Sequence, residues 1–505
     1  MKTKLELNKF FSDIYEMGRD GIPNFKMYAG GEWYFPAEGK FLDVHSPIDD
    51  SVIARVSMAA EEDANKVVGA ADKGKIAIRR MPAIKRLHVM QDAANLLEIY
   101  KEDFVNTIVI NGGKTIGDAE GEVHATKNRL MLTSQEARKI FGDYVPGDWA
   151  EENVGKYAMV IREPVGVVLA ISPFNYPLFI TFTKAIPALL AGNSVIVKPP
   201  SADPLPALLM TKIMAAAGIP AGALSVITGR GALGGYIAES PLIDMVTFTG
   251  STSVGTQLSR ASGIKKIHLE LGGKASAIVL DDVDPKEVAE KVLAGSLKNA
   301  GQRCDAISRV LVQSKIAPRL IKELKAGISA WKLGDPRDKS TRVGPLIDSK
   351  AAERVAMLVA DAVRSGAKVE CGGKPKGNFF EPTLLTRVPE EAKIMWEETF
   401  GPVVAVHVFE DIDDAIDLAN KSEYGLDSCV FTDNINHAWK VAKRLEVGEV
   451  TVNNFPAHGV GIFPFGGVKE SGLGREGIGY SIEEFTNTKT VVIDTKAAKT
   501  WENAI

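Results

Sequence analysis

The chain has 505 residues, of which 25% are charged, and its formal net charge is −4. A chain of this length holds more than one hydrophobic core, so we expect two or three domains. The balanced charge excludes nucleic acid and anionic membranes as partners, and the three scattered cysteines exclude a disulfide framework and a zinc site.

The N-terminal segment 1–7 is charged and lacks the apolar region of a signal peptide. The most apolar run, residues 164–190, is interrupted by prolines and by Lys184, which makes it too broken to span a bilayer. We therefore expect a cytoplasmic protein without a membrane partner.

Strand-like and helix-like segments alternate along most of the chain. The run 165–171 is continuously apolar and rich in β-branched residues, which is typical of a strand buried on both faces. The predicted strands are 165–171, 194–197, 224–227, 245–248, 275–280, 309–312 and 403–408, and the predicted helices are 178–190, 205–217, one opening at 250–255, and 285–300. This alternation predicts an α/β protein with parallel sheets covered by helices on both faces.

Two strand-like segments do not fit a compact core. One is the stretch 144–149 leading into 157–162, and the other is 488–494 near the C-terminus. An isolated apolar strand needs a partner edge, so we expect the two segments to pair with each other and with another subunit. The alternative is a frayed C-terminal tail.

A cysteine and a glutamate stand in settings that suit catalysis. Cys304 follows Arg303 among small residues, and a nearby cation favours the reactive thiolate. Glu270 precedes a pair of glycines and suits a base that activates water. The alternative for Cys304 alone is a buried cysteine that packs as a small hydrophobic residue.

Four further residues lie where a nucleotide and a reacting carbonyl would bind. Lys198 ends a predicted buried strand, at the sheet edge where open α/β sheets bind ligands. Gly250 and Ser251 open a helix, whose free amides suit a pyrophosphate. Asn175 follows another strand at the same sheet end, where its amide suits an oxyanion. Taken alone, Lys198 fits an ordinary strand end equally well, whereas Gly250 with Ser251 is more often an ordinary capped helix start and Asn175 more often a turn residue.

Seven motifs together resemble the aldehyde dehydrogenase superfamily in order and spacing, over residues 27–493. They are 174–177 (FNYP), 198–199 (KP), 248–252 (FTGST), 269–274 (LELGGK), 301–304 (GQRC), 398–402 (ETFGP) and 464–467 (PFGG). Within the superfamily, segments 142–149 and 301–307 resemble the archaeal non-phosphorylating glyceraldehyde-3-phosphate dehydrogenases.

The resemblance implies a fold with three parts. A Rossmann-like cofactor-binding domain would comprise 1–141 and 162–274, and an α/β catalytic domain would comprise 275–478. A small β oligomerisation extension would comprise 142–161 and 479–505, which implies a homotetramer or a homodimer.

The resemblance also assigns catalytic roles. Cys304 would attack the aldehyde, Asn175 would hold the oxyanion, and Glu270 would activate the water that releases the acid. The presence of Glu270 argues against the coenzyme-A-acylating branch, which resembles this pattern but lacks that base. A non-catalytic binding protein and a redox sensor acting through Cys304 are the alternatives from other classes, and the joint presence of these three residues favours an enzyme.

For the cofactor, the resemblance implies binding by Lys198, Ser201, Gly231, Phe248, Gly250, Ser251, Leu271, Glu398 and Phe400. NAD-preferring relatives often carry a glutamate where this chain has Ser201. A carboxylate would repel a 2′-phosphate and a hydroxyl would not, so we expect NADP as the preferred cofactor and NAD as the alternative. No metal is expected.

For the substrate, Tyr176 and Arg303 resemble residues that bind the phosphate in non-phosphorylating relatives. His458 and Ala125 stand where those relatives carry arginines, and Arg129 lies one helical turn after Ala125. We expect Tyr176, Arg303, His458 and Arg129 to bind a phosphorylated three-carbon aldehyde, glyceraldehyde-3-phosphate, which would become 3-phosphoglycerate. Glyceraldehyde, lactaldehyde and semialdehydes stay open.

Overall fold

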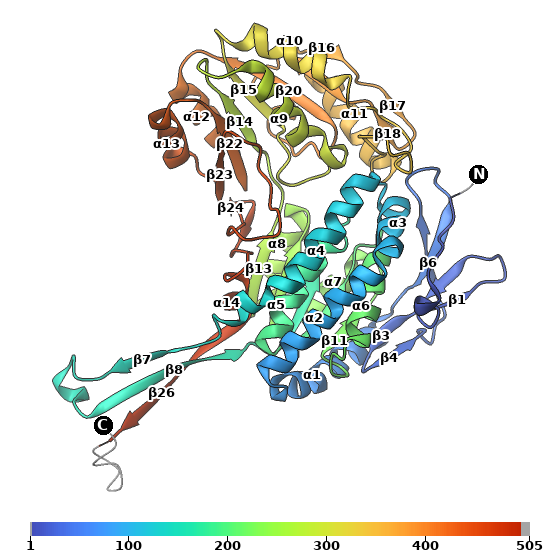
Figure 1. Cartoon of the computed structure of the whole chain (residues 1–505), viewed down its shortest axis with the longest axis vertical. Coiled ribbons are helices and arrows are strands. Elements are labelled where there is room, and N and C mark those ends of the chain that lie inside the picture. Colours follow the sequence, from blue (N-terminus) through green and yellow to red (C-terminus); the bar gives the residue numbers. More distant parts are fainter. Residues whose placement is uncertain (1–2, 496–505) are drawn as a thin grey trace.

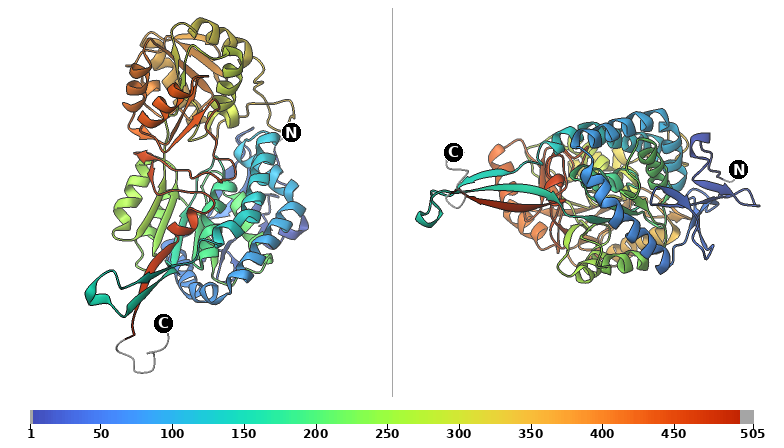
Figure 2. Two further views of the ribbon diagram at one scale, coloured as in Figure 1. Left: turned by 60° about the vertical axis from the view of Figure 1, so that its left-hand side comes forward. Right: turned by 90° about the horizontal axis from the view of Figure 1, so that it is seen from below.

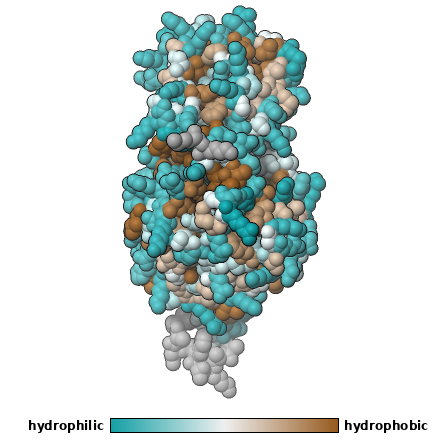
Figure 3. Space-filling view, turned by 90° about the vertical axis from the view of Figure 1, so that its right-hand side faces the viewer, coloured by the Kyte–Doolittle hydropathy of each residue, from teal (hydrophilic) through white to brown (hydrophobic). Residues whose placement is uncertain are grey.

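The computed structural model describes residues 3–495. Two large sheets, each packed with helices, form the two ends of an elongated body, and a narrow three-stranded sheet projects from it (Figures 1 and 2). The face shown in Figure 3 is hydrophilic over its two ends and gathers apolar side chains near mid-height. Within residues 3–495, no helix has the length and apolar character to cross a membrane.

The first large sheet has eight strands. In spatial order they are β25 (Gly472–Leu473), β13 (Lys266–Glu270), β12 (Met245–Thr249), β9 (Val167–Ile171), β10 (Ser194–Lys198), β11 (Leu224–Val226), β3 (Met27–Ala29) and β4 (Glu32–Tyr34). The strands β13, β12, β9, β10 and β11 are parallel, as predicted. The edge strands β25, β3 and β4, which were not among the predicted strands, pair antiparallel. Antiparallel edge strands arrive through hairpins or distant segments and need no crossover helix.

Helices cover both faces of this sheet. In β9, Val168 and Ala170 pack in one apolar core, and Val167, Leu169 and Ile171 pack in another. Side chains alternate along a strand, so a strand that is apolar at every position requires cover on both sides. The covering helices are α2 (Ala83–Ile99), α3 (Lys101–Gly112), α4 (Ile116–Ala137), α5 (Phe179–Ala191) and α6 (Leu205–Ala216) on one face, and α1 (Glu61–Arg80), α7 (Gly231–Glu239) and α8 (Thr252–Ser262) on the other.

The second large sheet has seven strands around its own apolar core. In spatial order they are β16 (Lys368–Cys371), β19 (Thr383–Thr386), β20 (Val403–Phe409), β15 (Arg309–Gln313), β14 (Ser276–Val279), β22 (Asp427–Phe431) and β23 (Glu449–Val452). All neighbours are parallel except β16 and β19. Its helices are α9 (Pro285–Leu297), α10 (Ala317–Ile328), α11 (Ser349–Arg364), α12 (Ile412–Asn420) and α13 (Ile435–Arg444).

A four-stranded sheet near the N-terminus was not foreseen, because two of its strands have only three residues each. Its order is β1 (Tyr15–Met17), β2 (Pro23–Phe25), β6 (Val52–Ser57) and β5 (Phe41–His45). The remaining short elements are η1 (Lys9–Phe11), η2 (Glu151–Asn153), η3 (Lys298–Gly301), η4 (Lys393–Met395), β17 (Pro375–Lys376), β18 (Phe379–Phe380), β21 (Tyr424–Gly425), β24 (Val468–Lys469) and α14 (Ser481–Glu484).

The projecting sheet joins two segments far apart in the chain. β26 (Thr486–Asp494) pairs antiparallel with β8 (Lys156–Pro164) along its whole length, and β7 (Asp143–Pro146) pairs with the other edge of β8. The predicted pairing of these segments with each other is confirmed. Residues 496–505 of the predicted extension lie outside the described residues, and the domain boundaries and the contact with another subunit stay predictions.

Candidate active site

Cys304 lies on a strained loop between the two large sheets. The loop contains three consecutive residues with positive φ, namely Asn299 (53°), Ala300 (54°) and Gly301 (71°). Left-handed backbone at two non-glycine residues costs about 1–3 kcal/mol each and persists only where surrounding contacts enforce it. Here Asn299 and Ala300 are buried, and Asn299 Nδ2 donates to the carbonyl of Asn175 at 3.3 Å. The loop therefore holds Cys304 in a defined place.

Two cavities meet at Cys304. The smaller, of about 250 Å³, is lined from α4, from the start of α5 and from the loop 455–465. The larger, of about 720 Å³, lies over the carboxyl ends of β9, β10 and β12. Cys304, Thr249 and Leu271 line both. One thiol is thus accessible from two sides, by a small molecule and by a larger one.

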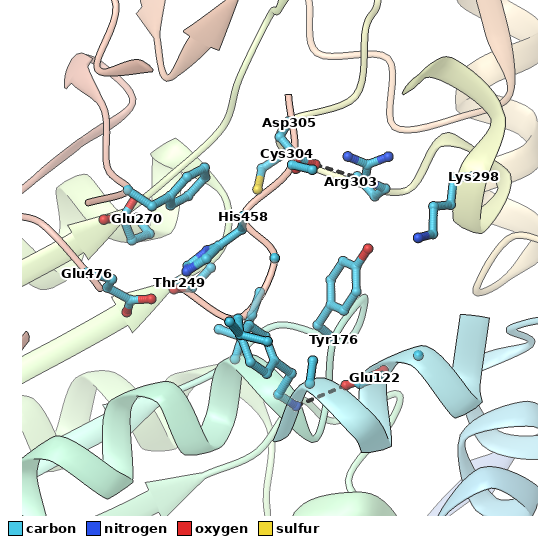
Figure 4. Close-up of a pocket in the computed structure, with 18 of the residues that line it drawn as sticks. Glu122, Tyr176, Thr249, Glu270, Lys298, Arg303, Cys304, Asp305, His458 and Glu476 are labelled. Carbon is cyan, nitrogen blue, oxygen red and sulfur yellow. Dashed lines mark hydrogen bonds and ion pairs between the residues drawn. The ribbon is translucent and has the colours of Figure 1, made fainter. Parts of the chain in front are cut away.

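The electropositive setting expected for Cys304 is wrong. Arg303 Nε donates to Asp305 Oδ1 at 2.9 Å, so its charge is largely compensated (Figure 4). Burial raises the pKa of the Cys304 thiol well above its ordinary value, and the carboxylates of Asp305 and Asp427 add to this rise. Cys304 is a protonated thiol at rest, and a base has to remove its proton before attack.

Asn175 lies beside the cysteine loop, as predicted. It is buried, and its Nδ2 donates to the carbonyl of Gln302 at 2.9 Å. Its Oδ1 has no hydrogen-bond partner among the described residues. The Asn175 amide is therefore held by the backbone of Gln302, two residues before Cys304 in the same loop.

Glu270 ends β13 and lines the smaller cavity with Cys304. Burial raises its pKa well above the ordinary value, and the carboxylate of Glu476 raises it further. Neither carboxyl oxygen has a hydrogen-bond partner among the residues described, although His268 Nε2 lies 3.3 Å from Oε1. A buried carboxyl with a raised pKa is a stronger base than an exposed one, which suits proton abstraction from water.

The larger cavity brings together most of the predicted cofactor residues. Those that line it are Lys198, Gly231, Phe248, Gly250, Ser251, Leu271, Glu398 and Phe400. Ser201 is the exception: Pro200 lines the cavity, whereas the Ser201 hydroxyl donates to the carbonyl of Gly229 at 2.8 Å.

The residues of this cavity suit the pyrophosphate and the ribose hydroxyls of a dinucleotide. Ser251 is the N-cap of α8, whose first amides are available to an anion. An added Cβ at Gly250 would lie only 2.5 Å from the Phe248 ring, so the glycine permits this close turn. Lys198 is buried, its Nζ donates to the Pro199 carbonyl at 3.1 Å and to no other acceptor among the described residues, and burial lowers its pKa to about 8. Glu398 accepts from the Gly273 amide at 3.0 Å and leaves its other oxygen for a ribose hydroxyl.

Three predicted substrate residues line the smaller cavity: Tyr176, Arg303 and His458 (Figure 4). Arg303 is buried, its Nη2 donates to the carbonyl of Pro456 at 2.9 Å, and its Nη1 has no partner among the described residues. His458 stacks on Phe465 with ring centroids 4.4 Å apart. Burial lowers its pKa, so the imidazole is neutral at pH 7 and does not supply the positive charge of the arginine that relatives carry there.

Arg129 is not part of the cavity wall, which corrects its predicted role. Its guanidinium forms a buried ion pair with Glu136 at 2.5 Å and donates to Ser481 Oγ at 3.3 Å. It lies behind Gly461, where an added Cβ would approach Nη1 to 3.1 Å. Ala125, one turn earlier on α4, does line the cavity. A buried arginine needs a carboxylate partner, and Glu136 keeps this one away from the substrate.

Lys298 was missed. It is exposed, lines the smaller cavity and extends from η3 on the same side as Tyr176 (Figure 4). Its position six residues before Cys304, on the same loop, is the feature of the sequence that could have indicated a place in the substrate cavity. Glu122 also lines this cavity, but its charge is compensated by Lys114 at 2.6 Å, and its Oε1 accepts the amides of Leu178 and Phe179 at the start of α5.

A half-buried thiol that lines both a large cavity suited to a nucleotide and a smaller cavity, with a buried carboxyl group nearby, is the arrangement expected of a nucleotide-dependent oxidoreductase. The chain belongs to the aldehyde dehydrogenase family, which it matches over residues 33–491. It is an NAD(P)-dependent enzyme that oxidises an aldehyde to the carboxylic acid.

Three proteins illustrate the similarity. The 3-sulfolactaldehyde dehydrogenase of Priestia aryabhattai is 38% identical over 475 residues, which are 94% of this chain and 98% of that protein. The NADP-dependent glyceraldehyde-3-phosphate dehydrogenase of Streptococcus equinus is 38% identical over 472 residues, 93% of this chain and 98% of that protein. The crystal structure of the NADP-dependent glyceraldehyde-3-phosphate dehydrogenase of Bacillus halodurans complexed with NADP superimposes with a TM-score of 0.91 at 37% identity, covering 93% of this chain and 99% of that one. The last similarity bears out the predicted fold.

Proposed function

We propose that the protein oxidises glyceraldehyde-3-phosphate to 3-phosphoglycerate with NADP, without forming an acyl phosphate. The observation that carries the proposal is Arg303: a buried guanidinium beside Cys304 with its Nη1 unpartnered among the described residues. An unpartnered buried donor is costly, and a phosphate oxygen would satisfy it with a charge-assisted hydrogen bond. The Tyr176 hydroxyl and the Lys298 ammonium line the same cavity and supply further donors.

The names of the relatives support an anionic substrate. They include a 3-sulfolactaldehyde dehydrogenase, NADP-dependent glyceraldehyde-3-phosphate dehydrogenases and a succinate-semialdehyde dehydrogenase of Escherichia coli. These aldehydes share a negatively charged group at the end of the molecule opposite the carbonyl. An arginine and a lysine in the cavity wall match that common feature.

We propose that the reaction proceeds through a thioester on Cys304. The Cys304 thiol proton passes to water in the cavity, the sulfur attacks the aldehyde carbon, and the Asn175 amide with the Cys304 backbone amide holds the oxygen of the resulting thiohemiacetal. The cofactor, when bound, accepts the hydride that leaves this carbon. The larger cavity reaches Cys304. A thiohemiacetal on this sulfur would therefore lie beside the site where the cofactor would bind.

Glu270 then promotes hydrolysis. It removes a proton from water, the water oxygen bonds to the acyl carbon, and the carbon–sulfur bond breaks with its electrons on sulfur. Cys304 has a raised pKa, so the leaving thiolate regains a proton readily and the resting thiol is restored.

Cofactor preference and assembly complete the proposal. Ser201 brings no carboxylate near Lys198, and several relatives carry NADP in their names, so NADP is preferred and NAD is the second cofactor. The enzyme would form a homodimer or homotetramer through the projecting sheet, whose edge strand β26 has no strand neighbour on its outer side among the described residues.

The test of substrate is a comparison of glyceraldehyde-3-phosphate with unphosphorylated glyceraldehyde. In Arg303→Leu, KM for the phosphorylated substrate should rise on the order of 100-fold, because a charge-assisted hydrogen bond is worth about 1.5–3 kcal/mol and a buried charge is lost with it. KM for glyceraldehyde should change far less. Lys298→Met serves as the exposed counterpart and should give a smaller shift in the same direction.

An equal loss on both substrates in Arg303→Leu would contradict phosphate recognition and would favour an uncharged aldehyde such as lactaldehyde. If the wild-type enzyme has a higher kcat/KM for 3-sulfolactaldehyde or succinate semialdehyde, the proposed anion-binding site would stand, but glyceraldehyde-3-phosphate would not be the substrate.

A further inference from the structure

The proposed base shares its strand with a histidine. His268 and Glu270 are two residues apart on β13, so their side chains lie on the same face of the sheet. His268 is only 2% exposed, and its Nε2 lies 3.3 Å from Glu270 Oε1. The His268 imidazole lines neither of the two cavities at Cys304. It can therefore affect the reaction only through its contact with Glu270.

The partners of Nδ1 determine which nitrogen carries the proton. Nδ1 lies 3.2 Å from Thr247 Oγ1 and 3.8 Å from Glu476 Oε1. Glu476 is ionised: burial raises its pKa, but Lys184 at 2.5 Å outweighs burial and holds the pKa at about 2. A carboxylate facing Nδ1 favours a proton there. The Nε2 lone pair then faces Glu270.

The imidazole itself is neutral. Burial and the Lys184 ammonium lower its pKa to about 4, with Glu476 opposing them. A neutral ring whose lone pair points at a carboxyl oxygen accepts a hydrogen bond from the protonated carboxyl and repels the ionised one. The contact therefore favours the protonated state of Glu270 over the carboxylate.

Two glycines keep the pair together. A Cβ on Gly466 would lie 2.8 Å from Glu270 Oε1, and a Cβ on Gly474 would overlap the His268 ring. Both glycines have positive φ, 151° and 92° respectively, so larger side chains are excluded by conformation as well as by space. The backbone is in van der Waals contact with both side chains and limits how far they can separate.

We propose that His268 is a positioning residue for Glu270: its Nε2 accepts a hydrogen bond from the carboxyl once that group has taken the proton of the hydrolytic water. The inference rests on the proposed role of Glu270 as base. In hydrolysis, the water oxygen bonds to the acyl carbon, the carbon–sulfur bond breaks, and one water proton passes to Glu270. His268 stabilises that protonated state and so makes Glu270 a stronger base. The second water proton leaves with the acid product.

Other charged groups surround the pair and are unchanged by substitution of His268. Lys184 on α5, Arg475 and Glu476 in the loop after β25, and Glu484 at the end of α14 all act on Glu270. The two basic groups lower its pKa and the two acidic groups raise it. The experiment below compares variants in which these four residues are constant.

The test follows hydrolysis of the acyl-enzyme. A single turnover with enzyme in excess over aldehyde, quenched at intervals, gives the rate of cofactor reduction and the rate of acid release separately. In His268→Leu, reduction should be close to wild type, whereas acid release should be about 10-fold slower at its high-pH plateau and its acid limb should move about one unit lower in pH, because a less basic carboxylate loses its proton earlier but abstracts one less well. In His268→Gln, whose amide oxygen can accept the same hydrogen bond, most of the shift should be absent.

The controls separate this inference from the role of Glu270 itself. Ile267→Val, a truncation on the other face of β13, should leave both rates and the pH profile unchanged, and thermal unfolding should show that all variants fold. An unchanged acid limb in His268→Leu, or a shift of equal size in His268→Gln, would overturn the role of His268. Wild-type acid release in Glu270→Gln would instead refute the proposed base. If His268→Leu does not fold, His268→Met, which also lacks a nitrogen acceptor, replaces it with the same expected direction.

Discussion

At the residue scale, the environment of Cys304 differs from the one its neighbours in sequence suggest. Arg303 stands next to it in the chain, but the guanidinium is turned to Asp305 and the thiol pKa is raised by burial. Sequence order shows which residue types are present, whereas the direction of a side chain depends on partners distant in the chain. The proposed roles of Cys304, Glu270 and Asn175 follow from short motifs that can be recognised in the sequence. The pairing of Arg129 with Glu136 could not, since nothing in the local pattern prefers this partner to a substrate.

The nucleophile gives the simplest prediction at this scale. Cys304→Ala should abolish aldehyde oxidation, by at least about 1000-fold in kcat, because a methyl group cannot form the thioester. Binding of NADP, measured by quenching of protein fluorescence, should persist. Substantial turnover by this variant would rule out covalent catalysis.

The proposed preference for NADP can be tested at a single residue, Ser201. Ser201→Glu should shift preference from NADP toward NAD, because a carboxylate near the 2′-phosphate costs on the order of 1–4 kcal/mol at short range. The ratio of kcat/KM for the two cofactors measures the shift, and Ser201→Ala is the control for loss of the bond to Gly229. If wild type already prefers NAD strongly, the premise is wrong.

At the scale of elements, the buried strands were predictable and the irregular segments were not. The strands β9, β10 and β12 appear within one or two residues of their predicted bounds, because continuous β-branched runs have few alternatives in a buried sheet. The predicted helix 285–300 ends earlier, at Leu297, and gives way to η3. Contacts with Asn175 and with the backbone of Gly401 impose the positive φ values of residues 299–301. A local sequence pattern does not reveal such tertiary contacts.

The shape of that loop can be tested. Gly301→Ala should lower the free energy of unfolding by about 2 kcal/mol or more, because φ is 71° and the new methyl group would overlap the Gly401 carbonyl. Activity should fall with it, since the loop positions Cys304. Denaturant unfolding measures the first effect. Gly235→Ala on α7, where an added Cβ meets nothing within 4 Å, is a matched control that should be neutral or nearly so. Equal stability of both variants would show that the loop adapts.

At the scale of the whole molecule, the projecting sheet is the feature that a lone chain does not explain. β26 has an outer edge without a strand neighbour among the described residues, and it exposes Val491 and Val492. Tyr144 on β7 and Met159 on β8 are also exposed. Long apolar edge strands are rare on isolated proteins because they pair with other chains. These observations support the proposed assembly through this sheet.

The assembly can be perturbed from that surface. Val492→Lys, combined with Val491→Lys, should shift the protein toward smaller species in sedimentation velocity, because two charges desolvated in an apolar contact cost several kcal/mol. Lys489→Arg on the same strand is the control and should leave the mass unchanged. An unaltered mass in the double variant would place the subunit contact elsewhere.

The position of Cys304 at the junction of two cavities also governs how the enzyme can be inactivated. A small alkylating agent can approach the sulfur from the nucleotide side or from the aldehyde side. Occupation of one cavity therefore leaves the other open, and protection against iodoacetamide should be incomplete with either ligand alone. An inhibitor that spans both cavities through the thiol would gain affinity from two recognition elements at once, the Lys198 end and the Arg303 end, and would distinguish this enzyme from dehydrogenases that lack the second.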